Sequence, residues 1–427
     1  MLQQQRYIIN TFSRIWQNGE TMRRFAIVGA SHRCLTMFVR GLADMRGRDL
    51  EFVSIYDPNR TRCEVFRGEV GDGLTIYSDF DEMMKTEKPD GVIVATTDNT
   101  HADYVIRSLD FGVDVYCEKP LTNTYEKCLA IREAEKRSGK KVAVTFNCRF
   151  MPYFAKLKEI LRSGVIGKVH AINYEYTLNR WHGGDYMKRW HGLMEVSQGM
   201  LLHKSTHHFD IVNWLLEDEP VKVNAMGLKS FYGNPERCLG YRCSTCEHTA
   251  ECESFKSQSA PMDKALYFDA EHEDGYIRDR CAHRPETDIY DNMSVSVMYK
   301  GGALVTYTLN LFSMREGYKM TLVGEKGMLL CQHYGKDLEG GDDYEIDLLT
   351  EENKIQRIIF PKAEGTHGGG DIRLREMMFG EGEHEDPLGQ AADSFAGVAS
   401  AMIGIGANES IKTGRVYDIA SALDTLR

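Results

Sequence analysis

Two histidines four residues apart, His203 and His207, are the first side chains in this sequence that could do chemistry. On a helix they share one stripe with Asp210 and Trp214, because spacings of four, three and four keep all of them on one face. Imidazoles can transfer protons near neutral pH, and a pair at this spacing can also bind a metal ion. A polar stripe opposite an apolar one can equally be a solvated helix face.

A loop expected ahead of this helix, Asp185 to His191, combines aromatic rings and cations. The rings of Tyr186 and Trp190 with Arg189 suit a sugar ring or an anionic sugar, although they would serve a domain interface equally well. We group Lys204 with them as a candidate substrate contact.

Further along the chain, the glycine-rich stretch from His367 to Asp371 allows close approach of the backbone to a ligand. Its histidine and aspartate could reach the same site. A glycine-rich connector between the last strands and the C-terminal helices explains the stretch nearly as well.

Cysteines form a second group of reactive side chains in the polar, turn-rich stretch 232–285, which we expect to be an insertion. Four thiols fall within 15 residues, which is far from chance in an intracellular chain. A tetrahedral structural zinc site could be closed by four of the cysteines: Cys243, Cys246, Cys252 and Cys281. An iron–sulfur cluster and simple reduced thiols are the alternatives. None of these interpretations makes the insertion catalytic.

The first half of the chain predicts the elements that must position such groups. Arg24 to Gly29 is typical of a short buried strand that ends in glycine, and a helix is expected from Leu35. A strand, a tight turn and a helix point backbone N–H groups at a pyrophosphate. We therefore expect dinucleotide contacts from four residues of this turn: Gly29, Ser31, His32 and Arg33.

A second strand, Leu50 to Asp57, ends in a carboxylate 28 residues after Gly29. An acidic side chain here can accept hydrogen bonds from both ribose hydroxyls and would repel a 2′-phosphate, so Asp57 favours NAD over NADP. Arg60, close by, keeps NADP possible. Further strands at 91–96, 113–117 and 141–146 alternate with helices, which predicts a doubly wound parallel sheet.

From about Pro152 the strands alternate polar and apolar residues. This period of two predicts an α+β domain with a large, mostly antiparallel sheet that leaves one face open. We expect four parts of the chain: an N-terminal appendage over 1–21, with Met22 as a candidate start, a Rossmann domain over 22–148, the α+β domain over 149–385, and a C-terminal helical return over 386–427.

Three motifs, each after a predicted strand, give the chain a resemblance to a known family. They are Thr96-Thr-Asp-Asn-Thr-His101, Glu118-Lys119-Pro120 and Asn147-Cys-Arg149-Phe-Met-Pro152. The set resembles the Gfo/Idh/MocA family of sugar and inositol dehydrogenases, over all of the N-terminal domain and over the second domain in outline. The resemblance implies that the second domain binds substrate. It also implies cofactor contacts from seven residues: Thr96, Asn99, His101, Glu118, Lys119, Asn147 and Arg149.

The resemblance further implies that Lys119 lies beside the nicotinamide and helps to move the proton of the substrate hydroxyl. A lysine that follows a parallel strand lies at the carboxyl edge of the sheet, and burial there lowers its pKa toward the range useful for acid–base catalysis. Family members carry Asp, three residues and then His on the histidine helix. Here His207 matches the histidine and His203 replaces the aspartate, so a neutral imidazole that can relay a proton stands where a carboxylate is usual.

Composition favours a cytoplasmic enzyme with small-molecule partners. The net charge of −11 argues against nucleic acid or an anionic membrane as the main partner, and no apolar stretch approaches the roughly 18 residues of a membrane span. The first residues do not resemble a signal peptide, so we expect the eleven cysteines to lie in a reducing compartment. A small-residue helix over 393–411 is expected to pack closely, and the chain is expected to form a homo-oligomer.

We therefore expect an NAD-dependent dehydrogenase that transfers hydride from a carbon of a sugar, sugar derivative or polyol. Lys119 and His207 would share general acid–base duty, with His203 orienting the substrate or relaying a proton. The alternative is a redox-neutral glycosidase that keeps NAD bound and oxidises its sugar only transiently. A sugar sensor without turnover is the third hypothesis.

Overall fold

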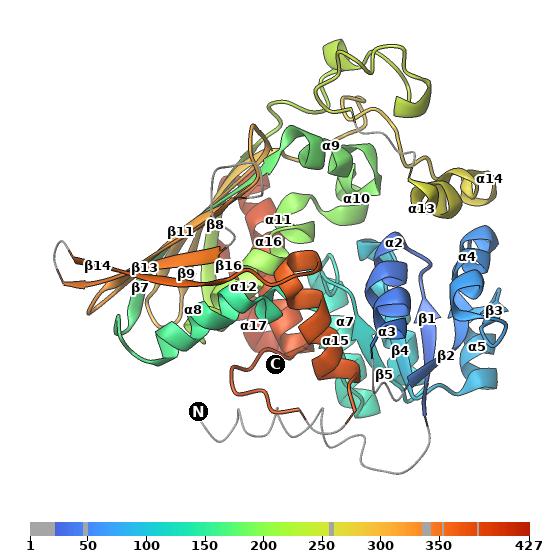
Figure 1. Ribbon diagram of the computed structural model, residues 1–427, viewed down its shortest axis with the longest axis horizontal. Helices are drawn as coiled ribbons and strands as arrows, with labels where there is room; N and C mark the ends of the chain where they lie inside the picture. The colour runs from blue at the N-terminus through green and yellow to red at the C-terminus, as the bar shows by residue number, and fades with distance from the viewer. Residues whose placement is uncertain (1–21, 46–49, 256–259, 335–342, 352–353, 382–383) are drawn as a thin grey trace.

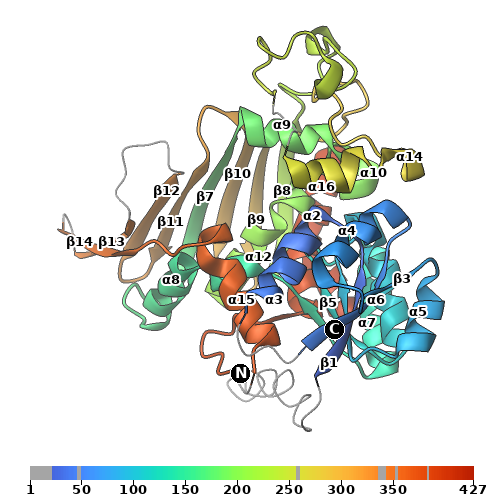
Figure 2. The same ribbon diagram turned by 45° about the vertical axis from the view of Figure 1, so that its right-hand side comes forward.

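The structure is a computed structural model that describes residues 22–45, 50–255, 260–334, 343–351, 354–381 and 384–427. The predicted appendage over 1–21 lies outside the described residues. Two β-sheets stand on opposite sides of the molecule, and helices α12 (Thr206–Leu216) and α16 (Ser394–Thr413) lie between them (Figures 1 and 2).

The first sheet has seven strands in the order β15-β6-β5-β4-β1-β2-β3, and only β15 is antiparallel. Its strands are β1 (Arg23–Val28), β2 (Leu50–Tyr56), β3 (Thr75–Tyr77), β4 (Gly91–Val94), β5 (Asp114–Cys117), β6 (Val142–Val144) and β15 (Ala392–Asp393). The helices that connect them are α2 (His32–Cys34), a π-helix (Leu35–Arg40), α3 (Gly41–Ala43), α4 (Arg60–Val70), α5 (Phe80–Glu87), α6 (His101–Asp110) and α7 (Tyr125–Ser138). The predicted doubly wound Rossmann fold is confirmed.

Strand β1 shows why this half of the sequence is so apolar. Phe25 and Ile27 pack into one core cluster, whereas Ala26 and Val28 pack into the cluster on the other face. A strand that is buried on both faces leaves no position for a polar side chain. Since the parallel strands all point the same way, the loops that follow them meet at one edge of the sheet, where ligands of such folds bind.

The second sheet has nine strands in the order β14-β13-β12-β11-β7-β10-β9-β8-β16. They are β7 (Val169–Asn179), β8 (Pro220–Leu228), β9 (Asn292–Tyr299), β10 (Leu304–Ser313), β11 (Gly317–Gly324), β12 (Met328–Tyr334), β13 (Asp343–Glu351), β14 (Lys354–Pro361) and β16 (Tyr417–Asp418). Residues of β9 alternate strictly between exposed and buried, as the predicted open sheet requires. The parallel pair of β7 and β10 was not predicted, because alternation fixes which face a residue occupies and not the strand direction.

Further helices outside the insertion are α8 (Pro152–Arg162), α9 (Arg180–Lys188), α10 (Met194–Ser197), α11 (Met200–His203), α15 (Gly370–Phe379) and α17 (Ile419–Leu426). The predicted histidine helix is therefore two helices, α11 and α12, separated at Lys204 and Ser205. The alternative of a solvated helix face does not hold for these histidines, because His203 is 7% exposed and His207 is 6% exposed.

The predicted loop at 185–191 is wrong as well, because α9 continues to Lys188. Two consecutive glycines, Gly183 and Gly184, weaken the helix pattern in the sequence. In the fold a side chain at Gly183 would collide with the carbonyl oxygen of Leu311 in β10, at 1.7 Å from a Cβ atom. The glycine thus lets the helix lie directly on the second sheet.

The insertion between β8 and β9 carries α13 (Pro261–Asp263), a π-helix (Lys264–Phe268) and α14 (Glu271–Asp274). This segment reaches away from the second sheet and lies over the Rossmann domain near α4 (Figure 1). Among the helices of the described residues, none is both long and apolar enough to cross a membrane.

Candidate active site

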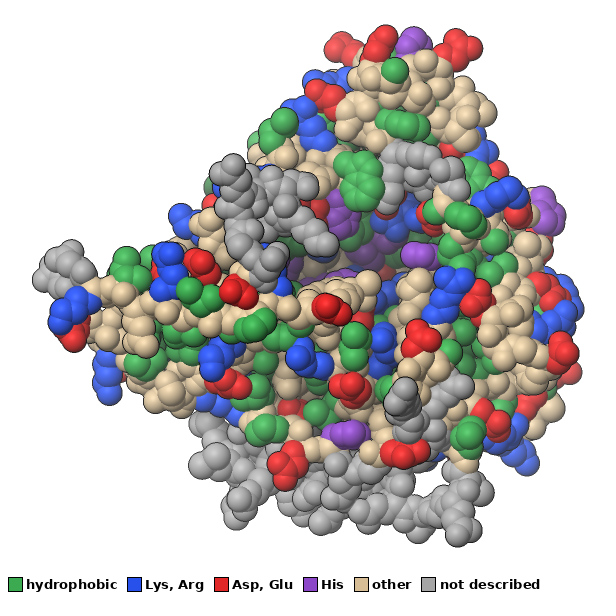
Figure 3. Space-filling view, viewed as in Figure 1, with side chains coloured by type: hydrophobic (Ala, Val, Ile, Leu, Met, Phe, Trp, Pro, Cys, Tyr) green, Lys and Arg blue, Asp and Glu red, His purple; other side chains and the backbone are tan. Residues whose placement is uncertain are grey.

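A hollow opens between the two halves of the molecule, below the insertion, and histidine side chains gather in it (Figure 3). The loops after β1, β2, β4, β5 and β6 form one side of this region. Helices α9, α11 and α12 supply side chains from the other.

The turn after β1 has the form that a pyrophosphate site needs. Gly29 has a φ of +99°, and a Cβ atom there would lie 2.7 Å from the backbone of Ala95, so only glycine fits. The Ser31 hydroxyl accepts a hydrogen bond from Cys34 N–H and donates one to the Ala95 carbonyl at 3.0 Å. The helical segment therefore begins at His32, three residues before the predicted start at Leu35.

Asp57 stands directly after β2 and is half-buried. Its carboxylate accepts hydrogen bonds from Ala30 N–H and Asn59 N–H, each at 2.8 Å, so the loops after β1 and β2 are tied together. Burial raises the pKa of Asp57. The position agrees with the predicted ribose contact, which stays a prediction.

Lys119 follows β5, with a cis peptide bond to Pro120. Its ammonium group donates a hydrogen bond to the His203 carbonyl at 3.1 Å. Burial lowers the pKa of Lys119, and the nearby Asp98 and Glu118 carboxylates only partly oppose that effect. The lysine predicted as the acid–base group is thus held at the backbone of the histidine helix.

His203 is paired with a carboxylate that sequence reasoning missed. Its Nδ1 lies 2.6 Å from Oδ2 of Asp98, which is 2% exposed and begins a short 3-10 turn, Asp98–Thr100, between β4 and α6. Burial raises the pKa of Asp98 well above its usual value, while burial and then Lys119 lower the pKa of His203 well below its own. The two atoms are close enough to share one proton. The motif Thr96–His101 already contained Asp98, but its partner lies 105 residues away.

His207 has a ring nitrogen that no neighbouring group in the described chain engages. Its Nδ1 is buried and has no hydrogen-bond partner among the described residues. Burial, Lys119 and Lys204 lower its pKa well below the usual value, so the imidazole is neutral near pH 7. A buried imidazole without a partner is costly unless a ligand satisfies it.

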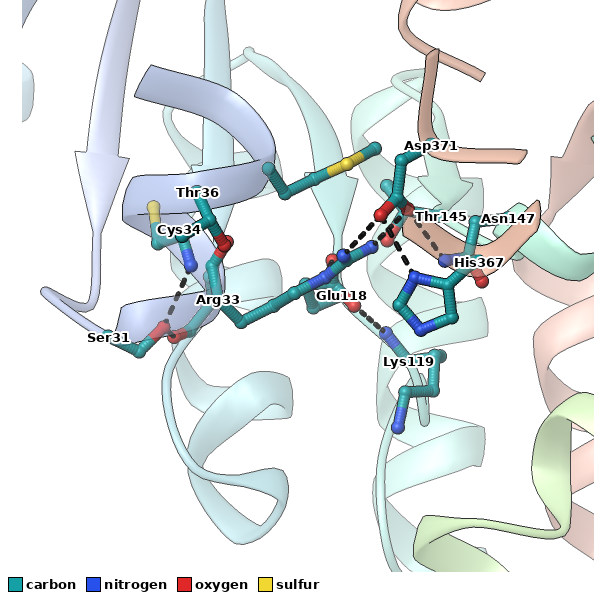
Figure 4. Close-up of polar contacts among 12 residues, drawn as sticks. Ser31, Arg33, Cys34, Thr36, Glu118, Lys119, Thr145, Asn147, His367 and Asp371 are labelled. Carbon is teal, nitrogen blue, oxygen red and sulfur yellow. Dashed lines mark hydrogen bonds and ion pairs between the residues drawn. The ribbon is translucent and has the colours of Figure 1, made fainter. Parts of the chain in front are cut away.

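A polar hub joins the turn after β1 to the C-terminal part of the chain (Figure 4). The Asp371 carboxylate accepts two hydrogen bonds from Arg33 at 3.0 Å, one from Asn147 at 2.7 Å and one from Thr366 at 2.5 Å, and it lies 2.9 Å from Nδ1 of His367. The stretch from His367 to Asp371 therefore reaches the site rather than merely connecting elements.

Other predicted cofactor residues are engaged within the protein. Glu118 accepts a hydrogen bond from Arg33 at 2.8 Å. Both ring nitrogens of His101 face carbonyl groups, of Pro120 at 2.8 Å and of Thr96 at 3.2 Å, and so brace the Lys119 loop.

Two further cofactor candidates are also bound by neighbours. The Asn99 carbonyl accepts a hydrogen bond from Lys127. Arg149 forms a buried ion pair with Asp210, with two contacts at 2.8 and 2.6 Å. Direct contact of these residues with a cofactor stays a prediction.

The predicted substrate residues do come together beside His203. The rings of Tyr186 and Trp190 lie 5.6 and 5.5 Å from the His203 ring. Arg189 is paired with Asp185 at 2.8 Å.

Lys204 differs from its neighbour Arg189 in its contacts. It lies 5.4 Å from the Tyr176 ring and forms no ion pair with a carboxylate of the described residues. Burial alone would lower the pKa of Lys204, but Tyr176, Tyr186 and Glu316 outweigh burial and raise it. Lys204 is therefore a charged ammonium group that pairs directly with no carboxylate of the described part of the chain.

The predicted metal centre is not supported. Cys243, Cys246, Cys252 and Cys281 line the wall of a cavity of about 320 Å³ in the insertion. Among the described residues, no three His, Cys, Asp or Glu side chains converge closely enough to hold a metal ion. The spacing along the sequence suggested a tetrahedral site, but spacing does not fix how the loops between the cysteines fold, and all eleven cysteines of the chain are free.

This architecture, with a lysine and two imidazoles at the carboxyl edge of a Rossmann sheet, defines a dinucleotide-dependent oxidoreductase. A family model described as "Oxidoreductase family, NAD-binding Rossmann fold" matches residues 23–146, and a Gfo/Idh/MocA C-terminal domain model matches residues 154–330. The chain belongs to the Gfo/Idh/MocA family of oxidoreductases.

Individual relatives agree with this assignment. The chain is 33% identical over 412 residues to YteT of Bacillus subtilis (strain 168), which is named as an oxidoreductase, covering 91% of this chain and 95% of that one. It is 30% identical over 201 residues to inositol 2-dehydrogenase 2 of Saccharopolyspora erythraea, covering 47% of this chain and 54% of that one.

Solved structures share the fold at low sequence identity. A levoglucosan dehydrogenase in complex with NADH has a TM-score of 0.68 at 16% identity, covering 93% of this chain and 99% of that one. The WlbA dehydrogenase of Bordetella pertussis, in complex with NADH and UDP-GlcNAcA, has a TM-score of 0.63 at 16% identity and the same coverage.

Proposed function

We propose that this protein is an NAD-dependent dehydrogenase that oxidises a CH–OH group of a sugar, sugar derivative or polyol. The observation that carries the proposal is the juxtaposition of Lys119 with His203 and His207 at the carboxyl edge of the Rossmann sheet. Relatives named as inositol and levoglucosan dehydrogenases support this substrate class.

The residues fit a nicotinamide dinucleotide. Gly29 admits close approach of a pyrophosphate, Asp57 offers a carboxylate to the ribose, and Lys119 lies at the edge where the cofactor crosses the sheet. When bound, NAD supplies the hydride acceptor.

In the proposed reaction the protein moves the proton of the substrate hydroxyl. Lys119, whose pKa is lowered by burial, takes that proton as the hydroxyl carbon is oxidised. The neutral His207 ring accepts or donates a hydrogen bond at the same oxygen, and His203, oriented by Asp98, holds the substrate. In the reverse direction the Lys119 ammonium group returns the proton to the carbonyl oxygen.

Lys204 narrows the proposed substrate class. Its ammonium group lies at the aromatic wall formed by Tyr176 and Tyr186 and has no carboxylate partner among the described residues. A substrate with a carboxylate or several acceptor oxygens would neutralise it, while the rings cover the apolar face of a sugar. We therefore place anionic sugars and sugar acids first among candidate substrates.

The decisive experiment incubates the purified protein with NAD⁺ and a panel of polyols, neutral sugars, sugar acids and aryl glycosides. We expect NADH absorbance to accumulate with one of the free sugars or polyols. In Lys119→Ala turnover should fall by about 10²–10⁴-fold, while NAD⁺ affinity measured by calorimetry stays nearly intact.

The exposed Lys412→Ala is the matched control and should keep full activity. Loss of NAD⁺ binding in Lys119→Ala would contradict the role assigned to this lysine. Release of aglycone without NADH accumulation would replace the dehydrogenase by the redox-neutral glycosidase, which no observation in the described residues favours.

We keep the cytoplasm as the proposed location, because the cysteines are free thiols, and we keep a homo-oligomer as the proposed assembly.

A further inference from the structure

The insertion of the second domain contacts the Rossmann domain on its cofactor side. Its segment 261–274 places Leu266 in the core of the Rossmann domain. The Tyr267 hydroxyl accepts a hydrogen bond at 3.1 Å from His32 N–H in the turn after β1, and the Ala270 carbonyl accepts one at 2.9 Å from Asn59 in the loop after β2. The segment thus runs along the edge where the two nucleotide-binding loops meet.

Glu273 of this segment occupies the beginning of α4. Its carboxylate accepts hydrogen bonds from Arg60 N–H at 2.6 Å and Thr61 N–H at 2.8 Å, and also from the Thr61 hydroxyl. These contacts, led by the Thr61 hydroxyl, lower the pKa of Glu273, so it carries a full negative charge at neutral pH. The first free amides of the helix after β2 are therefore already bound to an anion.

The two arginines near the start of α4 are also paired with carboxylates. Arg60 pairs with Glu64 at 3.2 Å, and Arg62 pairs with Asp274 of the insertion at 2.8 Å. In Rossmann enzymes that use NADP, a cation near the end of the second strand accommodates the 2′-phosphate. In this chain the candidate cations and amides are paired with carboxylates, and two of these carboxylates come from the insertion.

We propose that Glu273 is a cofactor-specificity residue that the substrate domain contributes to the Rossmann domain and that excludes the 2′-phosphate of NADP. Asp57 alone would disfavour that phosphate by charge, whereas Glu273 also takes the hydrogen-bond donors that the phosphate would need. The inference rests on the dinucleotide binding of the proposed function. It further explains why Arg60, suggestive of NADP in the sequence, does not provide a phosphate site.

Binding calorimetry with NAD⁺ and NADP⁺ tests the proposal without any substrate. In Glu273→Gln the side chain keeps its shape and loses its charge. We expect NADP⁺ binding to tighten by about tenfold while the Kd for NAD⁺ changes by less than about twofold. Glu273→Ser, which also frees the two amides, should tighten NADP⁺ binding further.

Glu271→Gln is the matched control, because Glu271 lies on the same helix and pairs with Arg242 inside the insertion. It should leave the ratio of the two Kd values unchanged. The role of Glu273 would be overturned if both Glu273 variants kept the wild-type melting temperature and the wild-type ratio of NADP⁺ to NAD⁺ affinity. The proposed function would not be affected by that result. A wild-type protein that binds neither dinucleotide would overturn the proposed function as well, so the two failures are distinguishable.

Discussion

The carboxyl group of Asp98 pairs with His203 of α11, a helix that has no carboxyl side chain of its own. The family resemblance led us to expect an aspartate where His203 stands, and the structure places a carboxylate within 2.6 Å of that imidazole from the opposite domain. A carboxyl group therefore still lies beside this helix, paired with His203. Sequence alone could not show this, because the contact joins a loop after β4 to α11.

This arrangement makes Asp98→Asn informative as a test of a positioning role. The substitution removes a charge that raises the pKa of Lys119, so that pKa should fall further. The acidic limb of kcat/KM for hydroxyl oxidation should then shift to lower pH, since the neutral amine is the active form. We expect kcat to fall by about tenfold, less than the ~10²–10⁴ that loss of the acid–base group itself costs.

The measurement is a pH profile of the wild type and of Asp98→Asn, with NAD⁺ affinity as the control. A variant whose kcat falls while the acidic limb of its kcat/KM profile stays at the wild-type pH would show that Asp98 only supports the fold.

At the scale of elements, the ion pair of Arg149 with Asp210 connects the 3-10 turn Asn147–Phe150 to α12. The side chains are 7% and 1% exposed, so neither charge can be solvated if its partner is removed. Arg149→Met should lower the free energy of unfolding by about 3–5 kcal/mol, because Asp210 is left as a buried charge. Chemical denaturation measures this loss.

The double variant Arg149→Met with Asp210→Leu provides the comparison. It should recover most of the lost stability, since replacing both members of a buried pair by apolar residues is often neutral. A single variant as stable as the wild type would mean that the pair does not hold these elements together.

The sequence predicted those elements whose burial leaves a direct local pattern in the residues. Strands such as β1 and β9 were predictable, because burial on two faces or on one leaves a direct pattern in the residues. The break at Ser205 and the glycine-containing α9 were not, because packing against the second sheet decides both. The same holds for Glu273, whose contacts with α4 depend on how a long insertion folds back.

At the scale of the whole molecule, four imidazoles are kept neutral by burial: His191, His203, His207 and His208. The pKa of each is lowered well below 6.5, so the unfolded chain takes up protons at a higher pH than the folded one. Stability from these groups is fully present above pH 6.5 and is lost as the pH falls below it, by up to about 1.4 kcal/mol per group and pH unit.

The expected outcome is a melting temperature that drops between pH 7.0 and 5.5. Asp57, Asp98 and Asp210, with their raised pKa values, act in the opposite direction but are three carboxyls against four imidazoles. His208→Gln should reduce the drop, because His208 is hydrogen-bonded to Tyr307 and has no part in the proposed reaction, so it can be replaced separately. The exposed His170→Gln is the control, and an equal drop in both variants would contradict this account.

The C-terminal segment adds the last strand to each sheet. β15 pairs with β6 of the first sheet and β16 pairs with β8 of the second. During synthesis the Rossmann domain leaves the ribosome first, yet the outer edge of β6 has no partner until Ala392 and Asp393 emerge some 250 residues later. An unpaired strand edge can pair with a strand of another chain. The edge of β6 therefore stays open to such pairing in the nascent chain through most of translation.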